Sequence, residues 1–188
     1  MIDLIGSMLL SHNNALENTF SQKYKAKLIR AANLMQNSLL TGNKIVLFGN
    51  GGSAADAQHI AAELISKLST DRIPLPSLAL TVNSSVITAI ANDYGYDSVF
   101  ARQVQALVSK GDTVIGITTS GKSKNVILGL EAAKERQANT IALTGKLGLE
   151  GYNPDVTLSI NASEIAAVQE LHILTGHILC KLAEQHYV

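Results

Sequence analysis

Residues 45–59 read Ile-Val-Leu-Phe-Gly-Asn-Gly-Gly-Ser-Ala-Ala-Asp-Ala-Gln-His, a short apolar run that leads into a glycine loop and then a helical segment. Four consecutive apolar residues, 45–48, are typical of a strand that is covered on both faces. The glycines after them let backbone amides approach a ligand, and the start of the helix adds a dipole that favours an anion. This unit predicts an α/β fold with a binding loop at the end of its first strand.

The rest of the chain repeats the alternation of short apolar runs with helical segments. Further strands are predicted at 78–80, 114–117, 141–143 and 156–160. Helices are predicted at 54–67, 84–92, 98–109, 124–137 and 163–186. Residues 2–40 have helical periodicity and precede Gly42, which indicates two N-terminal helices. The pattern predicts a doubly wound five-stranded parallel sheet flanked by helices, with a long C-terminal helix.

Composition limits the classes of protein that fit. The chain has 188 residues, 46% of them hydrophobic, which suits one domain over residues 1–188. Fifteen basic residues balance fifteen acidic ones, so we expect neither nucleic acid nor a membrane surface as a partner. The single cysteine excludes a disulfide framework, and no basic residue precedes the first apolar positions. We therefore expect a cytoplasmic protein.

The terminal helices are apolar on more than one side, which is unusual for the surface of a monomer. This holds for the helices of residues 1–42 and for the last helix. We expect self-association, with residues 1–42 as an oligomer interface.

Two loops lie where ligands bind in open α/β sheets, after the carboxyl ends of strands. The loop of residues 49–53 fits either an anion site or a tight turn with Ser53 as the helix N-cap. The loop after residue 117 carries four hydroxyl groups that could hold a phosphate or simply cap a helix. These are Thr118, Thr119, Ser120 and Ser123.

Both loops also match motifs of nucleotide-binding proteins. Gly49, Gly51 and Ala54 fit a dinucleotide pattern, but no acidic residue follows the next strand to hold a ribose. Residues 116–123 spell a P-loop, but Gly116 falls inside the predicted strand and no acidic strand end is available for magnesium. Neither a nicotinamide cofactor nor a nucleoside triphosphate is expected.

His59 and Glu63 share one face of the predicted helix after the glycine loop, since they are four residues apart. Such a pair is often only a surface hydrogen bond. On the last helix, however, Gln169 and His177 face roughly the same way, and these four side chains could together bind a metal such as zinc. His172 points elsewhere, which predicts a structural role. A carboxylate in a site that grips a phosphorylated sugar suits proton abstraction beside a carbonyl, as in aldose–ketose isomerisation.

Five segments resemble the sugar isomerase (SIS) domain family, and within it the phosphoheptose isomerases. These are residues 48–59, 91–95, 118–123, 142–146 and 169–172. The resemblance runs nearly end to end. It implies a homotetramer with active sites at subunit interfaces. It also implies conversion of sedoheptulose 7-phosphate to D-glycero-D-manno-heptose 7-phosphate through an enediol, for bacterial heptose, lipopolysaccharide or capsule precursors.

The resemblance also implies roles for individual residues. Glu63 would be the base and His177 the acid or ring-opening partner, with one zinc ion per subunit. The zinc ligands would be His59, Glu63, Gln169 and His177. The sugar would contact Asn50, Gly51, Gly52, Ser53, Asn92 and Asp93, besides His59, Glu63 and Gln169. The phosphate would bind Thr118, Thr119, Ser120 and Ser123.

Two alternatives remain open at this point. One is a non-catalytic SIS tetramer that binds the bacterial replication initiator protein, a relative that lacks the carboxylate and the terminal histidine present here as Glu63 and His177. The other is an isomerase of a different phosphosugar. The sequence also departs from the family pattern, because Ala167 and Lys67 stand where the family has arginine, and neither reproduces the bidentate fork of a guanidinium.

Overall fold

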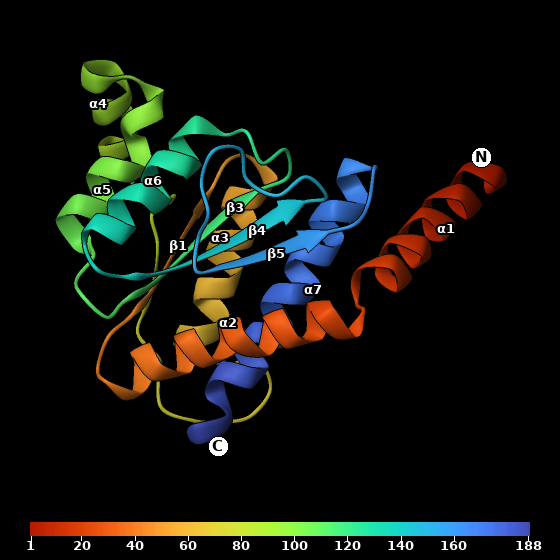
Figure 1. The fold of residues 1–188 in the computed structure, drawn as a ribbon, viewed down its shortest axis with the longest axis horizontal. Helices are drawn as coiled ribbons and strands as arrows, with labels where there is room; N and C mark the ends of the chain where they lie inside the picture. Colours follow the sequence, from red (N-terminus) through yellow and green to blue (C-terminus); the bar gives the residue numbers. More distant parts are fainter.

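The computed structural model describes residues 1–188 and contains one parallel sheet of five strands (Figure 1). Its strand order is β2-β1-β3-β4-β5. The strands are β1 (Ile45–Gly49), β2 (Ser77–Ala79), β3 (Thr113–Thr118), β4 (Asn139–Gly145) and β5 (Val156–Ile160). All five predicted strands are present. β5 has the predicted bounds, β1, β3 and β4 extend one or two residues beyond theirs, and β2 starts and ends one residue earlier than predicted.

The helices also follow the predicted order. They are α1 (Ile2–Thr19), α2 (Gln22–Leu40), α3 (Gly52–Ile65), α4 (Ser84–Tyr94), α5 (Val99–Leu107), α6 (Lys124–Glu135) and α7 (Ile165–Ala183). Two single turns of 3₁₀ helix, η1 (Tyr96–Ser98) and η2 (Glu184–His186), precede α5 and follow α7. The main correction is at α3, which begins two residues before the predicted start, directly after the glycine loop.

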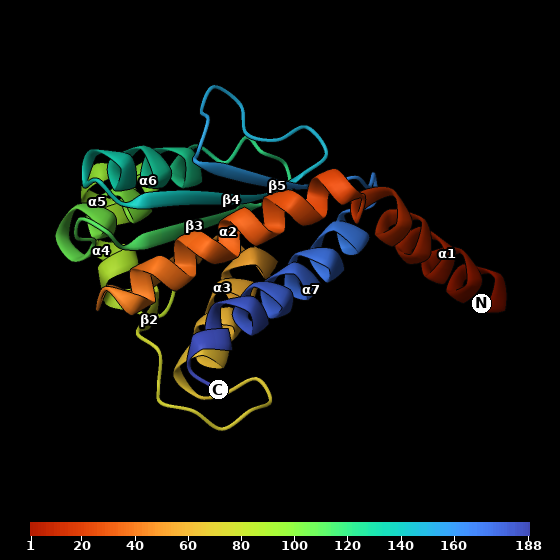
Figure 2. The same cartoon turned by 60° about the horizontal axis from the view of Figure 1, so that its bottom comes forward.

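Alternating residues of the strands fill two separate cores, because successive side chains of a strand point to opposite faces. Ile45 and Leu47 of β1 pack with α2, α3 and α7, whereas Val46 and Phe48 pack with α5 and α6. Figure 2 shows α2 and α7 on one side of the sheet and α5 and α6 on the other. The sheet is therefore the middle layer of three, as its uninterrupted apolar strands predict.

Helix α1 projects away from the sheet and contacts mainly α7 (Figures 1 and 2). Only Ala15 and Thr19 of this helix are buried. Its exposed apolar side chains are Ile2, Leu4, Ile5, Met8, Leu9 and Leu10. No helix of the chain combines the length and apolar character needed to cross a bilayer.

The order of the strands fixes where a ligand can bind. The chain leaves β1 toward β2 on one side and returns to β3 on the other, so the topological switch point lies between β1 and β3. In such sheets the binding crevice lies beyond the carboxyl ends of the two strands at this point. Residues after Gly49 and after Thr118 meet there, since these two strands are paired in parallel register.

Candidate active site

Asn50 joins the two loops at the switch point. Its Nδ2 donates to Oδ1 of Asn125 at 2.9 Å, and Nδ2 of Asn125 donates back to Oδ1 of Asn50 at 2.9 Å. The hydroxyl of Tyr96 donates to the same Oδ1 of Asn50 at 3.0 Å. The Asn50 side chain, predicted to line a sugar, is therefore held between the start of α6 and η1.

The glycine loop brings α3 and α7 together. Gly51 is the N-cap of α3 with φ +56°, so Ser53 is not the N-cap but a buried residue of the first turn. At Gly52, a Cβ atom would lie 2.5 Å from Nε2 of Gln169. The absence of a side chain at this position thus allows the amide of Gln169, on α7, to lie against the loop.

His59, Glu63 and His177 converge in the structure although 118 residues separate the two histidines. Nε2 of His59 lies 3.0 Å from Nε2 of His177 and 3.3 Å from Oε1 of Glu63. Their ligand atoms all lie within 4.8 Å of one another. The side chain of His59 is 49% exposed and that of Glu63 is 19% exposed, so the cluster faces the surface of the chain.

This donor set fits a divalent metal. At metal–nitrogen distances of about 2.0–2.1 Å, two nitrogens of a tetrahedral site lie about 3.3 Å apart, close to the separation of the two Nε2 atoms. Two imidazoles and a carboxylate are common zinc ligands, and three protein ligands leave a position for substrate. Gln169 makes no hydrogen bond to this cluster, and its contact is with Gly52.

His172 lies on α7 between Gln169 and His177 but is completely buried on another face. Its Nε2 donates to the carbonyl of Thr144 at 3.1 Å, and its Nδ1 has no partner. Burial lowers the pKa of His172 from 6.5 to about 4, against the effect of the Thr144 hydrogen bond. This neutral, buried imidazole has the structural role that the sequence predicts.

The loop of residues 118–123 carries the four hydroxyl groups and is named the hydroxyl loop. Its side chains make hydrogen bonds within the loop. Oγ1 of Thr118 and Oγ of Ser123 share a hydrogen bond of 2.9 Å, and Oγ of Ser120 accepts from the amide of Lys122 at 3.2 Å. Ser123 is the N-cap of α6, but its hydroxyl makes no capping hydrogen bond. No hydroxyl of this loop therefore caps α6 through a side-chain hydrogen bond.

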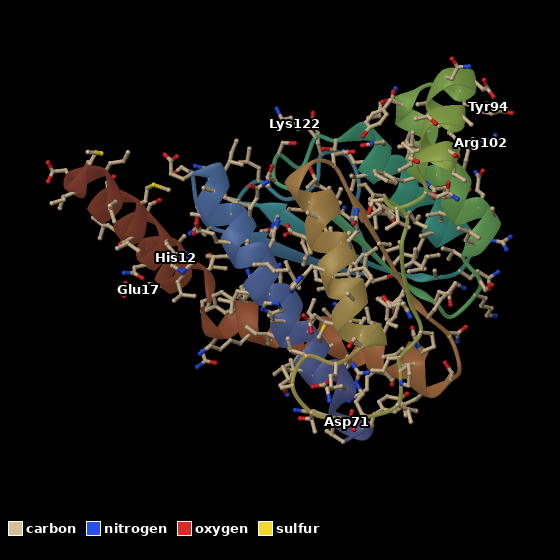
Figure 3. The ribbon with its side chains drawn as sticks, turned by 180° about the vertical axis from the view of Figure 1, so that it is seen from behind. His12, Glu17, Asp71, Tyr94, Arg102 and Lys122 are labelled. Atoms are coloured by element: carbon tan, nitrogen blue, oxygen red, sulfur yellow. The ribbon has the colours of Figure 1, made fainter.

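The first amides of α6 stay available to a ligand. Val126 and Ile127 donate to the carbonyl of Ser123, whereas no group of the chain accepts from the amides of Lys124 and Asn125. A small cavity of about 230 Å³ opens beside this loop. It is lined by Ser120, Gly121, Lys122, Leu147, Gly148 and Glu150. Figure 3 shows Lys122 at the outer edge of the molecule there.

Gly116 confirms that the P-loop match is accidental. It lies inside β3, where a Cβ atom would come 2.9 Å from Cδ1 of Leu130 on α6. A glycine is needed at this position for α6 to pack on the sheet, not to bind phosphate.

Asn92 and Asp93 are not brought to the other candidate residues. They lie in the last turn of α4, where Nδ2 of Asn92 donates to Oδ1 of Asp93 at 2.7 Å. The guanidinium of Arg102 on α5 stacks 3.7 Å from the ring centre of Tyr94, which fixes this end of α4 over α5 (Figure 3). Within one chain these two residues contact neither the His59–Glu63–His177 cluster nor the hydroxyl loop.

Asp56 lies near His59, and the sequence pattern predicts no role for it. It lies one turn before His59 on α3, and its Oδ2 is buried without a hydrogen-bond partner. Burial raises the pKa of Asp56 above its ordinary value, and the nearby His59 opposes this effect. Its spacing of three residues from His59 is the only signal in the sequence that could have pointed to it.

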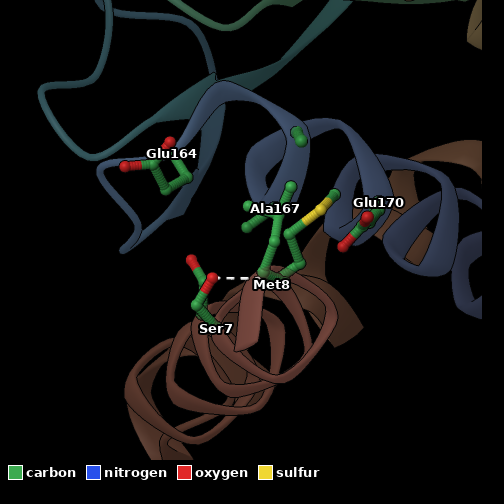
Figure 4. Close-up of a pocket in the computed structure, with 8 residues that line it drawn as sticks. Ser7, Met8, Glu164, Ala167 and Glu170 are labelled. Atoms are coloured by element: carbon green, nitrogen blue, oxygen red, sulfur yellow. Dashed lines mark hydrogen bonds between the residues drawn. The ribbon is translucent and has the colours of Figure 1, made fainter. Parts of the chain in front are cut away.

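The two departures from the family pattern lie in different surroundings. Lys67 is at the surface and pairs with Asp71 at 3.2 Å. Ala167 lines a cavity of about 490 Å³, which lies between α1 and α7 (Figure 4). Met8 and Glu170 line the same cavity, and Glu170 also pairs with His12 of α1 at 2.6 Å.

Comparison with known proteins agrees with this fold. The profile of the SIS domain matches residues 10–145, so the chain belongs to the SIS domain family. Within that family it is a member of the phosphoheptose isomerases, and hence an enzyme of the isomerase class.

Similarity to individual members extends over nearly the whole chain. It is 48% identical to the phosphoheptose isomerase of Aquifex aeolicus over 167 residues, covering 88% of this chain and 87% of that one. It is 44% identical to that of Nitratiruptor over 188 residues, covering all of both chains. The structure of a phosphoheptose isomerase from Francisella tularensis superimposes with a TM-score of 0.93 at 37% identity, over 98% of each chain.

Proposed function

We propose that the protein isomerises sedoheptulose 7-phosphate to D-glycero-D-manno-heptose 7-phosphate through an enediol. The observation that carries the proposal is the convergence of His59, Glu63 and His177, of which the first two lie on the helix that follows the glycine loop. The similarity to enzymes named phosphoheptose isomerase supports the choice of substrate. The proposed setting is the cytoplasm, where the product would enter heptose synthesis for lipopolysaccharide or capsule.

Glu63 is the proposed base. Only one of its oxygens, Oε1, is engaged by His59, which leaves the other to take a proton from C1 of the open-chain ketose and return it to C2. This transfer creates the aldehyde at C1 and the hydroxyl at C2. His177, 3.0 Å from His59, is placed to exchange the proton between the two sugar oxygens or to assist ring opening.

Zinc is the proposed metal, held by His59, Glu63 and His177, with Gln169 as the fourth candidate ligand beside the glycine loop. When bound, a divalent ion polarises the carbonyl and stabilises negative charge on the enediol oxygens. Glu63 would then serve as both ligand and base, a combination that requires its second oxygen to remain free for the proton.

The phosphate is proposed to bind at the hydroxyl loop. Ser120 borders the cavity, Thr119 lines a neighbouring one, and the amides of Lys124 and Asn125 at the start of α6 have no acceptor within the chain. A phosphate at this position would accept from amides at the positive end of a helix dipole. Thr118 and Ser123 would complete the set by reorienting their shared hydrogen bond, while Asn50, Gly51, Gly52 and Ser53 line the sugar.

We propose that the working form is a homotetramer and that the chain acts as a single SIS domain over residues 1–188. The exposed apolar face of α1 and the cavity between α1 and α7 support residues 1–42 as the subunit interface. Asn92 and Asp93, which reach no other site residue within the chain, would contribute to a site formed between subunits.

The experiment that tests this function compares the wild type with Glu63→Gln, both loaded with zinc. Each is incubated with sedoheptulose 7-phosphate, and proton NMR follows the aldose product. The wild type should turn over, and the variant should be about 10²–10⁴-fold slower because it lacks the base. A folded, zinc-loaded wild type without turnover would refute this substrate and favour another phosphosugar or the initiator-binding alternative.

A further inference from the structure

Arg72 and Glu184 form a buried ion pair at the C-terminal ends of α3 and α7, the two helices that carry the metal cluster. Nε of Arg72 donates to Oε2 of Glu184 at 3.1 Å, and the two side chains are 0% and 1% exposed. Arg72 comes from the segment after α3, which Figure 2 shows passing beneath the ends of α3 and α7. Glu184 opens η2, directly after α7.

The guanidinium of Arg72 also closes the last turn of α3. Nη2 donates to the backbone carbonyl of Glu63 at 2.9 Å, and Nη1 donates to the carbonyls of Ser66 and Ile73 at 3.1 and 3.0 Å. The last carbonyls of a helix have no partner within the helix, and a positive charge there interacts favourably with the dipole. Arg72 thus supplies both the missing donor and the charge.

The hydrogen bonds of Arg72 to the end of α3 matter for the reaction because Glu63, the proposed base, lies in the turn that they hold. Glu63 lies two residues before the end of α3, in a turn that would fray without a cap. Its carboxylate must nevertheless stay 3.3 Å from His59 and face His177 on α7. One residue, Arg72, binds the backbone of Glu63 and, through Glu184, the end of the helix that carries His177.

Glu184 is itself held in place. Nζ of Lys181 donates to its Oε1 at 3.1 Å and also contacts Oγ of Ser69 in the segment that carries Arg72. His177 and Glu184 are seven residues apart, which places them on nearly the same face of α7, two turns from each other. Arg72 and Glu184 therefore join the C-terminal ends of α3 and α7, directly beyond the metal cluster.

We propose that Arg72 and Glu184 are positioning residues, which set Glu63 relative to His177 and so determine metal affinity and the rate of proton transfer. This inference rests on the proposed function for the reaction that it supports. Removing Glu184 alone would leave the buried guanidinium of Arg72 without a counter-charge, and removing Arg72 alone would leave the buried carboxylate with only the half-exposed Lys181. Either change would destabilise the fold for a separate reason.

The test therefore uses two variants. Arg72→Met/Glu184→Met removes the pair without leaving a buried charge, and Arg72→Lys keeps a charge for Glu184 but loses the fork that reaches three carbonyls. Zinc affinity is measured by competition with a chromogenic chelator, turnover is measured with sedoheptulose 7-phosphate, and the melting temperature is measured on metal-free protein.

We expect both variants to bind zinc about 10–100-fold more weakly and to lose a similar factor in kcat, as partners of metal ligands do, with KM changed less than about twofold. The matched control is Asp112→Asn. Asp112 is equally buried, at 1% exposed, and pairs with Lys44 at the amino ends of β3 and β1. This control should lower the melting temperature but leave zinc affinity and kcat unchanged.

Variants that melt lower yet bind zinc and turn over like the wild type would overturn the proposal and leave the pair a merely structural role. If the double variant does not fold, Arg72→Lys decides by the same criteria. A wild type that binds zinc but does not turn over the heptose phosphate refutes the proposed function alone, and the zinc affinities then decide the role of the pair.

Discussion

The buried His172 predicts a specific loss of stability on mild acidification. Its pKa is 6.5 in the unfolded chain and about 4 in the folded protein, so between these values only the unfolded chain binds the proton. Stability therefore falls as the pH falls. Below pH 4 the free energy of unfolding is lowered by the full amount, about 3.4 kcal/mol. This amount is the difference between the two pKa values, 6.5 minus 4, multiplied by 1.36 kcal/mol for each unit. Between pH 7 and pH 5 the same linkage lowers the free energy of unfolding by about 1.8 kcal/mol.

The assay is urea unfolding followed by circular dichroism between pH 5 and 8, on metal-free protein at fixed concentration. Metal is removed because its own affinity depends on pH, and concentration is fixed because oligomers gain stability by mass action. The loss of about 1.8 kcal/mol corresponds to a decrease of about 4–7 °C in melting temperature for a chain of this size.

The control is His172→Leu, which replaces the imidazole with an apolar side chain of similar size. It should be less stable than the wild type at pH 7 because the carbonyl of Thr144 loses its donor. The difference between the two proteins should shrink by about 1.8 kcal/mol on going to pH 5. If the free energies of unfolding of the two proteins changed in parallel with pH, His172 would not be the source of the acid destabilisation, and the reasoning would be refuted.

Three further predictions concern the site and the assembly. His59→Ala should abolish stoichiometric zinc in the purified protein, measured by atomic emission, and retained zinc would place the metal elsewhere. Ser120→Ala should raise KM about ten- to hundredfold through a lost hydrogen bond to the phosphate, with a smaller change in kcat, and an unchanged KM would reject that role. Met8→Asp, which puts a charge on the apolar face of α1, should shift the mass measured by light scattering from a tetramer to smaller species; an intact tetramer would argue against residues 1–42 as the interface.

The sheet could be predicted from sequence because its strands are buried on both faces and are therefore uninterrupted apolar runs. The structure places short β2 one residue before the predicted strand, since Leu80, which follows β2, is more buried than any residue within it. The start of α3 was missed for a different reason. Glycines normally argue against a helix, but Gly52 begins α3, where a side chain would collide with Gln169.

The candidate site could be predicted only where its signal is local. The spacing of His59 and Glu63 and the run of hydroxyls after β3 are visible in the sequence. The pair of Asn50 and Asn125 is not, because it depends on two loops that meet only after the sheet has formed. Arg72 belongs to no periodic pattern, and its role is set by burial and by contacts to α3 and to a residue 112 positions away.

The structure divides the proposed reaction between two parts of the molecule. The hydroxyl loop and the start of α6 belong to the sheet edge at the switch point, whereas the proton-transferring groups belong to the α3–α7 pair. The glycine loop connects them, because Gly51 caps α3, Gly52 receives Gln169 from α7, and Asn50 bonds to α6. Changes at the hydroxyl loop should therefore affect KM, and changes in the helix pair should affect kcat. Asn50→Ala removes the bond between the two parts, together with one proposed sugar contact, while leaving the proposed metal ligands, phosphate contacts and base in place, so it should alter both constants. A change in only KM or only kcat would show that the two parts keep their relative position without the bond between Asn50 and Asn125.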